Sequence, residues 1–171
     1  GYPNYGHAPD NTSYTFPWAG QYVMRSDWTK DACYLLFEAG PYGTGHQHQD
    51  KLNIVLSAYG QYLIPDPGIH SYDDGIWTKY FRTSPAHNTI QVDQRLKEEM
   101  YSGWTLSYNI SQYRKKTTGI GEATSPLTDN WLTTNFLDWA SGIYNEGYYN
   151  VDGTGNPFND TSVTHKREVF F

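Results

Sequence analysis

Short runs in which apolar and polar residues alternate recur along most of this chain, and turn-forming residues separate them. In a strand, successive side chains point to opposite faces, so each run predicts a strand with one buried face. The Tyr59-Gly60 pair between two of the runs predicts a hairpin turn. Strands are predicted over residues 22–25, 31–37, 52–58, 61–66, 87–93, 104–110, 130–137 and 163–171.

The segments between these runs show little periodicity. Residues 1–20, rich in Pro, Gly, Asn and Tyr, predict a loop or linker, and residues 69–85 predict a long irregular loop. One short, charge-dense segment, residues 95–100, is the helical candidate. Many short strands with turn signals between them predict an all-β fold, an antiparallel β-sandwich, over residues 21–171.

Both ends of the chain resemble cuts through a longer polypeptide. The sequence opens on Gly1 without a Met, and it stops at Phe171 inside a strand-like run. We therefore expect a truncated or excised part of a larger protein, with a sandwich that is incomplete at its C-terminus. Its 171 residues are still enough for one domain with a core of its own.

Composition narrows the classes of function. A net charge of −6 argues against nucleic-acid binding, which needs a basic surface. The sequence has no run of 18 apolar residues, which argues against a membrane span. Aromatic residues make up 17% of the chain, and such rings pack in cores but also stack on sugars. The basic residues are scattered, which argues against a surface that recognises clustered sulfate groups.

Four residues of metal-binding type fall close together in the sequence. They are His46, His48, Asp66 and His87. If the histidine pair lies in a strand, His46, His48 and Asp50 share one face. Imidazoles combined with a carboxylate form an ordinary zinc set, and three protein ligands are enough for one ion. The alternative is that each is a hydrogen-bonded polar residue, but their joint spacing favours a metal site.

The order and the flanks of these residues resemble a known family. The matching motifs are Gly45-His46-Gln47-His48-Gln49-Asp50, Asp66-Pro67-Gly68 and Ala86-His87-Asn88-Thr89. In this order they resemble the sandwich region of the heparinase II/III-like polysaccharide lyases, which include heparinases and oligoalginate lyases. The resemblance implies a larger enzyme, in which an α/α toroid of helical hairpins precedes the sandwich. An acidic polysaccharide then lies in the cleft between the two parts.

The resemblance also implies a role for each site residue. His48, Asp66 and His87 match three ligands of a structural zinc ion. His46 matches a histidine that faces the substrate near its carboxylate. Tyr72, in the loop after Asp66, matches a catalytic tyrosine, and Tyr80 is the alternative.

The implied activity is cleavage of uronate-containing glycans by β-elimination, in which a base removes the C5 proton and an acid assists the departing C4 oxygen. Without the helical toroid, the chain alone is expected to be inactive. A periplasmic or secreted location follows from the same resemblance. Two other hypotheses are a non-catalytic carbohydrate-binding or structural zinc module, and a small zinc hydrolase. The histidine pair has no adjoining Glu to act as a base, which argues against the hydrolase.

Overall fold

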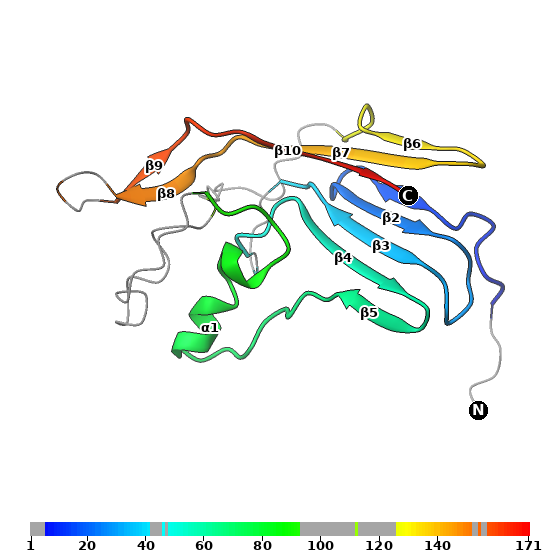
Figure 1. Cartoon of the computed structure of the whole chain (residues 1–171), viewed down its shortest axis with the longest axis horizontal. Coiled ribbons are helices and arrows are strands. Elements are labelled where there is room, and N and C mark those ends of the chain that lie inside the picture. Colours follow the sequence, from blue (N-terminus) through cyan, green and yellow to red (C-terminus); the bar gives the residue numbers. More distant parts are fainter. Residues whose placement is uncertain are drawn as a thin grey trace.

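The computed structural model describes residues 6–41, 46, 48–92, 112, 126–151, 154 and 157–171. Within these residues nearly every regular element is a strand (Figure 1). The strands are β1 (Tyr14–Phe16), β2 (Gln21–Arg25), β3 (Tyr34–Glu38), β4 (Asn53–Ala58), β5 (Gln61–Ile64), β6 (Trp131–Thr133), β7 (Asp138–Tyr144), β8 (Tyr148–Val151), β9 (Pro157–Asp160) and β10 (His165–Phe170). A short α-helix, α1 (Ile76–Tyr80), and a 3₁₀ turn, η1 (Ser84–Ala86), lie between β5 and β6. Among the described residues, no helix is long and apolar enough to cross a membrane.

The strand pairs are antiparallel, which confirms the expected fold class. Strands β1 to β5 follow one another in order across a five-stranded sheet, so each pairs with its sequence neighbour. A second sheet has the order β10-β7-β6, and β8 pairs with β9 in a two-stranded sheet. In Figure 1 the second sheet lies across one face of the first, and the β8–β9 hairpin projects beyond it.

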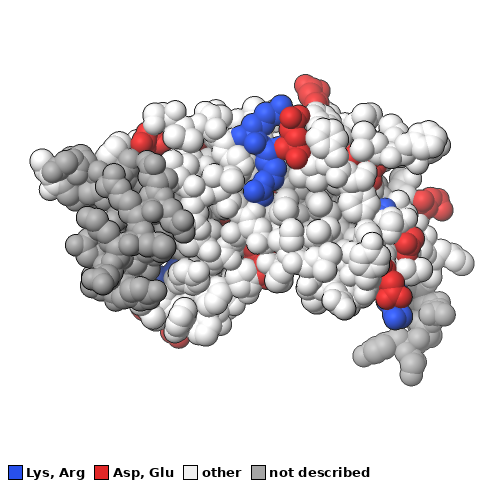
Figure 2. Space-filling model, viewed as in Figure 1, with Lys and Arg blue, Asp and Glu red and all other residues white. Residues whose placement is uncertain are grey.

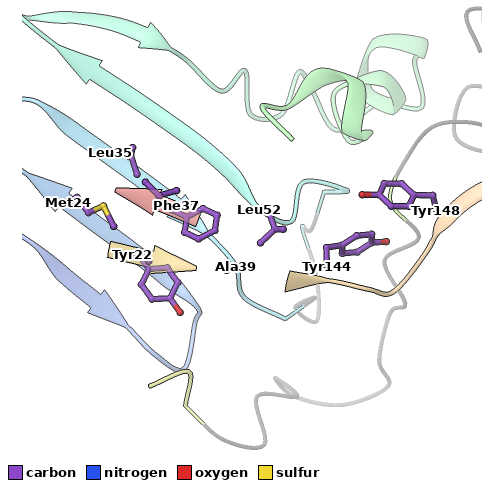
Figure 3. Close-up of a cluster of buried hydrophobic side chains, with 10 residues drawn as sticks. Tyr22, Met24, Leu35, Phe37, Ala39, Leu52, Tyr144 and Tyr148 are labelled. Atoms are coloured by element: carbon purple, nitrogen blue, oxygen red, sulfur yellow. The ribbon is translucent and has the colours of Figure 1, made fainter. Parts of the chain in front are cut away.

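The hydrophobic core lies between the two larger sheets. In β2 and β3 every second residue is buried, as strand alternation requires. The Tyr22 ring stacks on the rings of Phe37 and Trp131, with centroids 5.8 and 5.7 Å apart, and so joins the sheets. The buried apolar cluster consists of Tyr22, Met24, Leu35, Phe37, Ala39, Leu52, Ala140, Tyr144, Tyr148 and Val169 (Figure 3).

Gly142 on β7 allows the two sheets to approach closely. A Cβ atom at this position would lie 2.6 Å from Ala39 Cβ and 3.2 Å from Phe37 Cζ. Close-packed interiors do not accommodate such contacts without a shift of the backbone, so a larger residue would force the sheets apart. The glycine therefore brings β7 directly against the end of β3.

The β4–β5 hairpin sets the position of two candidate site segments. Tyr59 and Gly60 have φ values of 56° and 71°, the pattern of a two-residue type I′ turn. The predicted turn is thus confirmed. Because β4 and β5 are antiparallel, the start of β4 and the end of β5 lie at the same end of the sheet. The residues that precede β4 and those that follow β5 are therefore neighbours in space.

Two loop predictions are wrong. Residues 1–20 include β1, an edge strand too short to show a period, so the sheet begins before the expected domain start at residue 21. Residues 69–85 include α1 and part of η1. Asp73 organises the start of α1, because its carboxylate accepts hydrogen bonds from the Gly75 N–H and the Thr78 hydroxyl, both at 2.8 Å. A helix of five residues is too short for a helical period to appear in the sequence.

The predicted strand over residues 87–93 is wrong as far as residue 92, where the described chain is irregular. The Asn88 side chain donates hydrogen bonds to the carbonyls of Ile54 at 3.0 Å and Pro65 at 2.8 Å. The Asn88 side chain thus binds the backbone carbonyls that a neighbouring strand would otherwise bind. The histidine pair does not lie in a strand either, because it precedes β4 and His46 has a left-handed φ of 57°.

Strand predictions for the second half of the chain succeed unevenly. Residues 163–171 contain β10, as expected. Residues 130–137 contain β6, but Thr134 ends the strand because its hydroxyl accepts a hydrogen bond from the Leu137 N–H at 3.0 Å. Strands β7, β8 and β9 escaped prediction, since small and polar residues interrupt their alternation. The predictions outside the described residues are the helix over 95–100 and the strand over 104–110.

Candidate metal centre and active site

Three segments meet at one end of the five-stranded sheet, where β4 begins and β5 ends. The residues that converge there are His48 and Asp50 before β4, Asp66 after β5, and His87 after η1. The first and third segments are joined through the backbone, because the Gln49 N–H donates to the Arg82 carbonyl at 2.9 Å. The candidate residues therefore lie in loops that the sheet holds side by side.

His48, Asp50 and His87 form a compact cluster. One ligand atom from each residue lies within 4.8 Å of the other two. The two imidazole rings are tilted, with centroids 5.1 Å apart. Two imidazoles and a carboxylate are a donor set that zinc accepts.

Asp66 joins this cluster through His87. Its Oδ2 lies 2.7 Å from His87 Nδ1 and accepts a hydrogen bond from the Asn53 amide at 2.9 Å. Its Oδ1 accepts the Gly68 N–H at 2.8 Å. Burial alone would raise the pKa of Asp66, but these hydrogen bonds and the His87 charge hold it below its usual value. Asp66 is therefore an ionised carboxylate that is able to bind a cation or to orient an imidazole.

The two imidazoles differ in their electrostatics. Burial lowers the pKa of His48, and the charge of His87 lowers it further. Burial alone would also lower the pKa of His87, but the hydrogen bond and charge of Asp66 raise it. The Nε2 atom of His87 is buried and makes no hydrogen bond of good geometry. The Phe81 carbonyl nevertheless contributes to raising the pKa of the His87 ring. A buried nitrogen in need of a partner, beside a second imidazole and two carboxylates, fits a zinc ion.

His46 and Tyr72 lie on an exposed part of the same region. Their rings meet edge to face with centroids 6.0 Å apart, and Tyr72 is 75% exposed. Tyr80 instead packs edge-on against Trp77 and Phe81, at 6.1 and 5.5 Å between centroids. Of the two candidate tyrosines, Tyr72 is thus the one in ring contact with His46.

Asn53, at the start of β4, organises the site and was missed by sequence reasoning. It is only 3% exposed. Its amide donates to Asp66, and its side-chain oxygen accepts the Asn88 N–H at 2.9 Å, which ties the Asp66 segment to the His87 segment. The signal for it was present, because a polar amide stands inside the apolar run of residues 52–56, and a buried amide needs partners.

Two half-buried charged residues, Arg167 and Glu38, lie close to these loops. Arg167 on β10 donates hydrogen bonds to the carbonyls of Leu52 and Asn88, so the second sheet holds loops that belong to the first. Burial lowers the pKa of Arg167. Glu38 ends β3, and burial, followed by the charge of Asp50, raises its pKa.

The surface carries charges of both signs. On the face drawn in Figure 2, Lys and Arg side chains lie beside Asp and Glu side chains. Ion pairs of this kind join Lys166 to Glu168 at 3.1 Å and Lys51 to Glu146 at 3.3 Å. Among the described residues, this face therefore shows no broad basic surface.

The fold and the cluster define an antiparallel β-sandwich domain with a candidate metal centre where β4 begins and β5 ends. The chain belongs to the heparinase II/III-like family, because the model described as Heparinase II/III-like, C-terminal, matches residues 8–154. This confirms the family that the sequence motifs resemble.

Individual relatives agree with this assignment. A heparin-sulfate lyase of Pedobacter heparinus is 31% identical in an alignment of 112 residues, which covers 61% of this chain and 17% of that protein. A solved heparinase III superposes with a TM-score of 0.64 at 21% identity, over 98% of this chain and 21% of that one. A heparan sulfate lyase HepC from Pedobacter heparinus gives 0.61 at 24% identity, with the same shares of each chain. The likeness to these solved structures supports the fold, and the chain spans about a fifth of the length of each relative.

Proposed function

We propose that this chain is the β-sandwich part of a polysaccharide lyase that cleaves uronate-containing glycans by β-elimination. The observation that carries the proposal is the ring contact of His46 with Tyr72 on an exposed surface, in a chain of this family. His46 lies two residues before His48, which belongs to the cluster with His87. The similar heparin-sulfate lyase is named for an acidic polysaccharide, which supports this class of substrate.

The reaction is an elimination that consumes neither water nor an oxidant. A base takes the proton from C5 of the uronate, the C4–O bond breaks, a C4=C5 double bond forms, and the departing oxygen receives a proton. The C5 proton becomes acidic enough when hydrogen bonds or positive charge neutralise the adjoining carboxylate. The protein must therefore supply two groups. One transfers the proton, and the other donates a hydrogen bond to the substrate carboxylate.

His46 and Tyr72 are suited to these two tasks. A ring N–H of His46 donates a hydrogen bond to the substrate carboxylate. The phenol oxygen of Tyr72, whose ring lies against that of His46, exchanges a proton with the reacting atoms. A positive neighbour lowers the pKa of a phenol and so makes it a better base.

We further propose that His48, Asp66 and His87 hold one structural zinc ion, and that Asp50 faces the same space. Donor chemistry supports this set, because the imidazoles of His48 and His87 lie together and the ionised Asp66 carboxylate lies 2.7 Å from His87 Nδ1. A zinc ion bound there would supply positive charge and cross-link the three loops. It would thereby fix the loops relative to the surface that carries the reacting groups.

Metal analysis of the purified chain tests the zinc site. Asp66→Asn should lower the zinc content and the unfolding temperature together, because an ion that binds only the folded state stabilises it. Asp50→Asn is the matched control and should keep the ion. The reverse result would assign Asp50 as the ligand. Zinc in the unmutated chain below about one-tenth of an ion per molecule, after growth in zinc, would refute the site.

Product absorbance tests the lyase reaction. The longest natural polypeptide that contains this chain is incubated with heparan sulfate, chondroitin and alginate, and near-ultraviolet absorbance reports the unsaturated uronate. We expect product from that polypeptide and none from the chain alone, because we propose that a helical toroid completes the site. Chain cleavage without the absorbance would indicate hydrolysis. Glycan binding without cleavage in either sample would indicate a non-catalytic module.

The expected substrates are polymers too large to cross a membrane, so we propose a periplasmic or secreted location. Fractionation of the source cells tests it. Protein confined to the cytoplasmic fraction would contradict this location while leaving the chemistry in place.

A further inference from the structure

Gln112 is a fully buried polar residue that connects the two histidine segments. Its side chain is 0% exposed. Its Oε1 accepts the Lys51 N–H at 2.8 Å, and its Nε2 donates to the Lys51 carbonyl at 2.7 Å. One side-chain amide thus satisfies both backbone groups of Lys51, as a neighbouring strand would.

The same residue also reaches the segment around His87. Its Nε2 lies 3.2 Å from Thr89 Oγ1, and its backbone N–H donates to Ser84 Oγ at 2.9 Å. These partners themselves bind the first segment, since the Thr89 hydroxyl donates to the Lys51 carbonyl at 2.7 Å and the Ser84 hydroxyl donates to the Gln49 carbonyl. Gln112 therefore closes a hydrogen-bond network that spans both segments.

A third contact anchors this network to the sandwich. Gln112 forms an isolated antiparallel bridge with Tyr148, the first residue of β8. Tyr148 belongs to the buried apolar cluster, and in Figure 3 it lies beside Tyr144, whose ring centroid is 5.2 Å from its own. The backbone of Gln112 is therefore paired with the start of β8 while its side-chain amide binds Lys51.

The partners of Gln112 flank the candidate ligands. Lys51 follows Asp50 directly and lies three residues after His48, whereas Ser84 and Thr89 lie on either side of His87. We propose that Gln112 is a positioning residue, which holds the His48 and His87 segments at the spacing that binds the metal ion. The inference rests on the zinc site of the proposed function.

The competing explanation is that Gln112 merely stabilises the fold, as buried amides do in general. The two explanations differ in what a substitution changes. A stabilising residue alters the free energy of unfolding alone. A positioning residue also alters the affinity and the coordination geometry of the ion in molecules that remain folded.

The test compares Gln112→Met with the unmutated chain. Met has a similar length and no amide, so the packing is largely kept while the hydrogen bonds are lost. Zinc affinity is measured by competition with a chelator, and the visible d–d spectrum of Co²⁺ reports coordination geometry. Asn130→Leu is the matched control, because the Asn130 amide binds the Ser141 carbonyl at 2.7 Å within the second sheet.

In Gln112→Met we expect a zinc dissociation constant about 10–100-fold higher and an altered Co²⁺ spectrum, as is typical when a group that orients a ligand is lost. Asn130→Leu should lower stability without either change. Equal affinity and spectrum in Gln112→Met would overturn the inference. An unmutated chain that binds no zinc would instead overturn the zinc site itself and this inference with it.

A second variant covers the case in which Gln112→Met does not fold. Thr89→Val keeps the side-chain shape and removes only the hydroxyl that links Gln112 and Lys51. We expect the same direction of change in zinc affinity and in the Co²⁺ spectrum, at a smaller size. An unchanged Thr89→Val beside an unfolded Gln112→Met would overturn the positioning role and leave Gln112 as a residue of the fold.

Discussion

Different interactions stabilise two regions of the molecule: the core between the two larger sheets, and the loops at the end of the five-stranded sheet. Between the sheets, rings and aliphatic side chains pack, as Tyr22 does on Phe37. At the sheet end, buried amides bind groups of distant segments, as Asn53 binds the Asn88 N–H and Gln112 binds the Lys51 backbone. The first arrangement depends on volume, and the second depends on where each donor and acceptor lies.

This difference separates stability from site geometry. Burial of apolar surface has no preferred direction, so it stabilises the sandwich without fixing any one atom. Hydrogen bonds are directional, and a buried polar group that loses its partner costs about 1–3 kcal/mol. Changes between the sheets should therefore alter the free energy of unfolding, whereas changes at the sheet end should alter metal binding or turnover in folded molecules.

The largest effect is expected at His46, on the exposed side of the sheet end. His46→Ala in the longest natural polypeptide should lower turnover about a thousandfold, ~4 kcal/mol in the barrier, because the substrate carboxylate loses a donor. Zinc content and the unfolding temperature should not change. His7→Ala, in the exposed N-terminal segment, is the control and should leave all three unchanged. Loss of zinc in His46→Ala would show that His46 is a ligand.

A substitution between the sheets should produce the opposite pattern. Gly142→Val should lower the free energy of unfolding by about 3 kcal/mol, because its side chain would overlap Ala39 and Phe37. Urea unfolding measures this change, and zinc bound per folded molecule should stay the same. Ile143→Thr, on the exposed face of β7, should change stability by less than about 0.5 kcal/mol. A stable Gly142→Val would mean that the sheets do not approach as described.

Tyr72→Phe tests a single hydroxyl at the sheet end. We expect turnover to fall at least about a hundredfold, with little change in substrate binding, because the variant keeps the ring and loses the group that carries the proton. Tyr62→Phe, at a similarly exposed position on β5, should have no effect. Near-normal turnover in Tyr72→Phe would move the assignment to Tyr80, whose own Phe variant should then be tested.

The smallest effect is expected at His165 on β10, a strand of the second sheet and therefore outside the site at the sheet end. Burial, followed by the charge of Arg167, lowers the pKa of His165 from 6.5 to about 4. Between these values the unfolded chain binds a proton that the folded chain does not, so stability falls as the pH falls from about 6.5 to about 4. Because the ring is partly exposed, we expect a loss of about 1–2 kcal/mol.

Urea unfolding at both ends of this pH range, with a chelator present, measures the effect. His165→Asn should show a shallower dependence on pH than the unmutated chain, because the group that titrates is gone. Identical pH dependence in the two proteins would show that His165 is not the source of the loss.

The same division explains which parts of the fold could be predicted from sequence. Strands β2 to β5 follow from alternation and from the Tyr59-Gly60 turn, which are local signals. The strand predicted over residues 87–93 is wrong as far as residue 92, because the Asn88 side chain binds the carbonyls of Ile54 and Pro65, which are remote in sequence. Local pattern carries no information about such partners.

The candidate site was predicted in part for the same reason. The motifs pointed to His48, Asp66 and His87, and the structure brings His48 and His87 together while Asp66 binds His87. The reasoning by strand alternation was wrong, since the histidine pair lies in a loop. Gln112 could not be found from the sequence, because its hydrogen-bond partners lie up to 61 residues away.

The reach of Arg167 across the sandwich has a consequence for the order of folding. The hydrogen bonds of this residue to Leu52 and Asn88 join positions that are 115 and 79 residues apart. Closing loops of such length costs entropy before any contact compensates for it, and contacts between remote residues slow folding. During synthesis the two histidine segments emerge long before Arg167, so their loops exist for a time without this support. We therefore expect the geometry around His87 to be completed late in folding, when β10 docks.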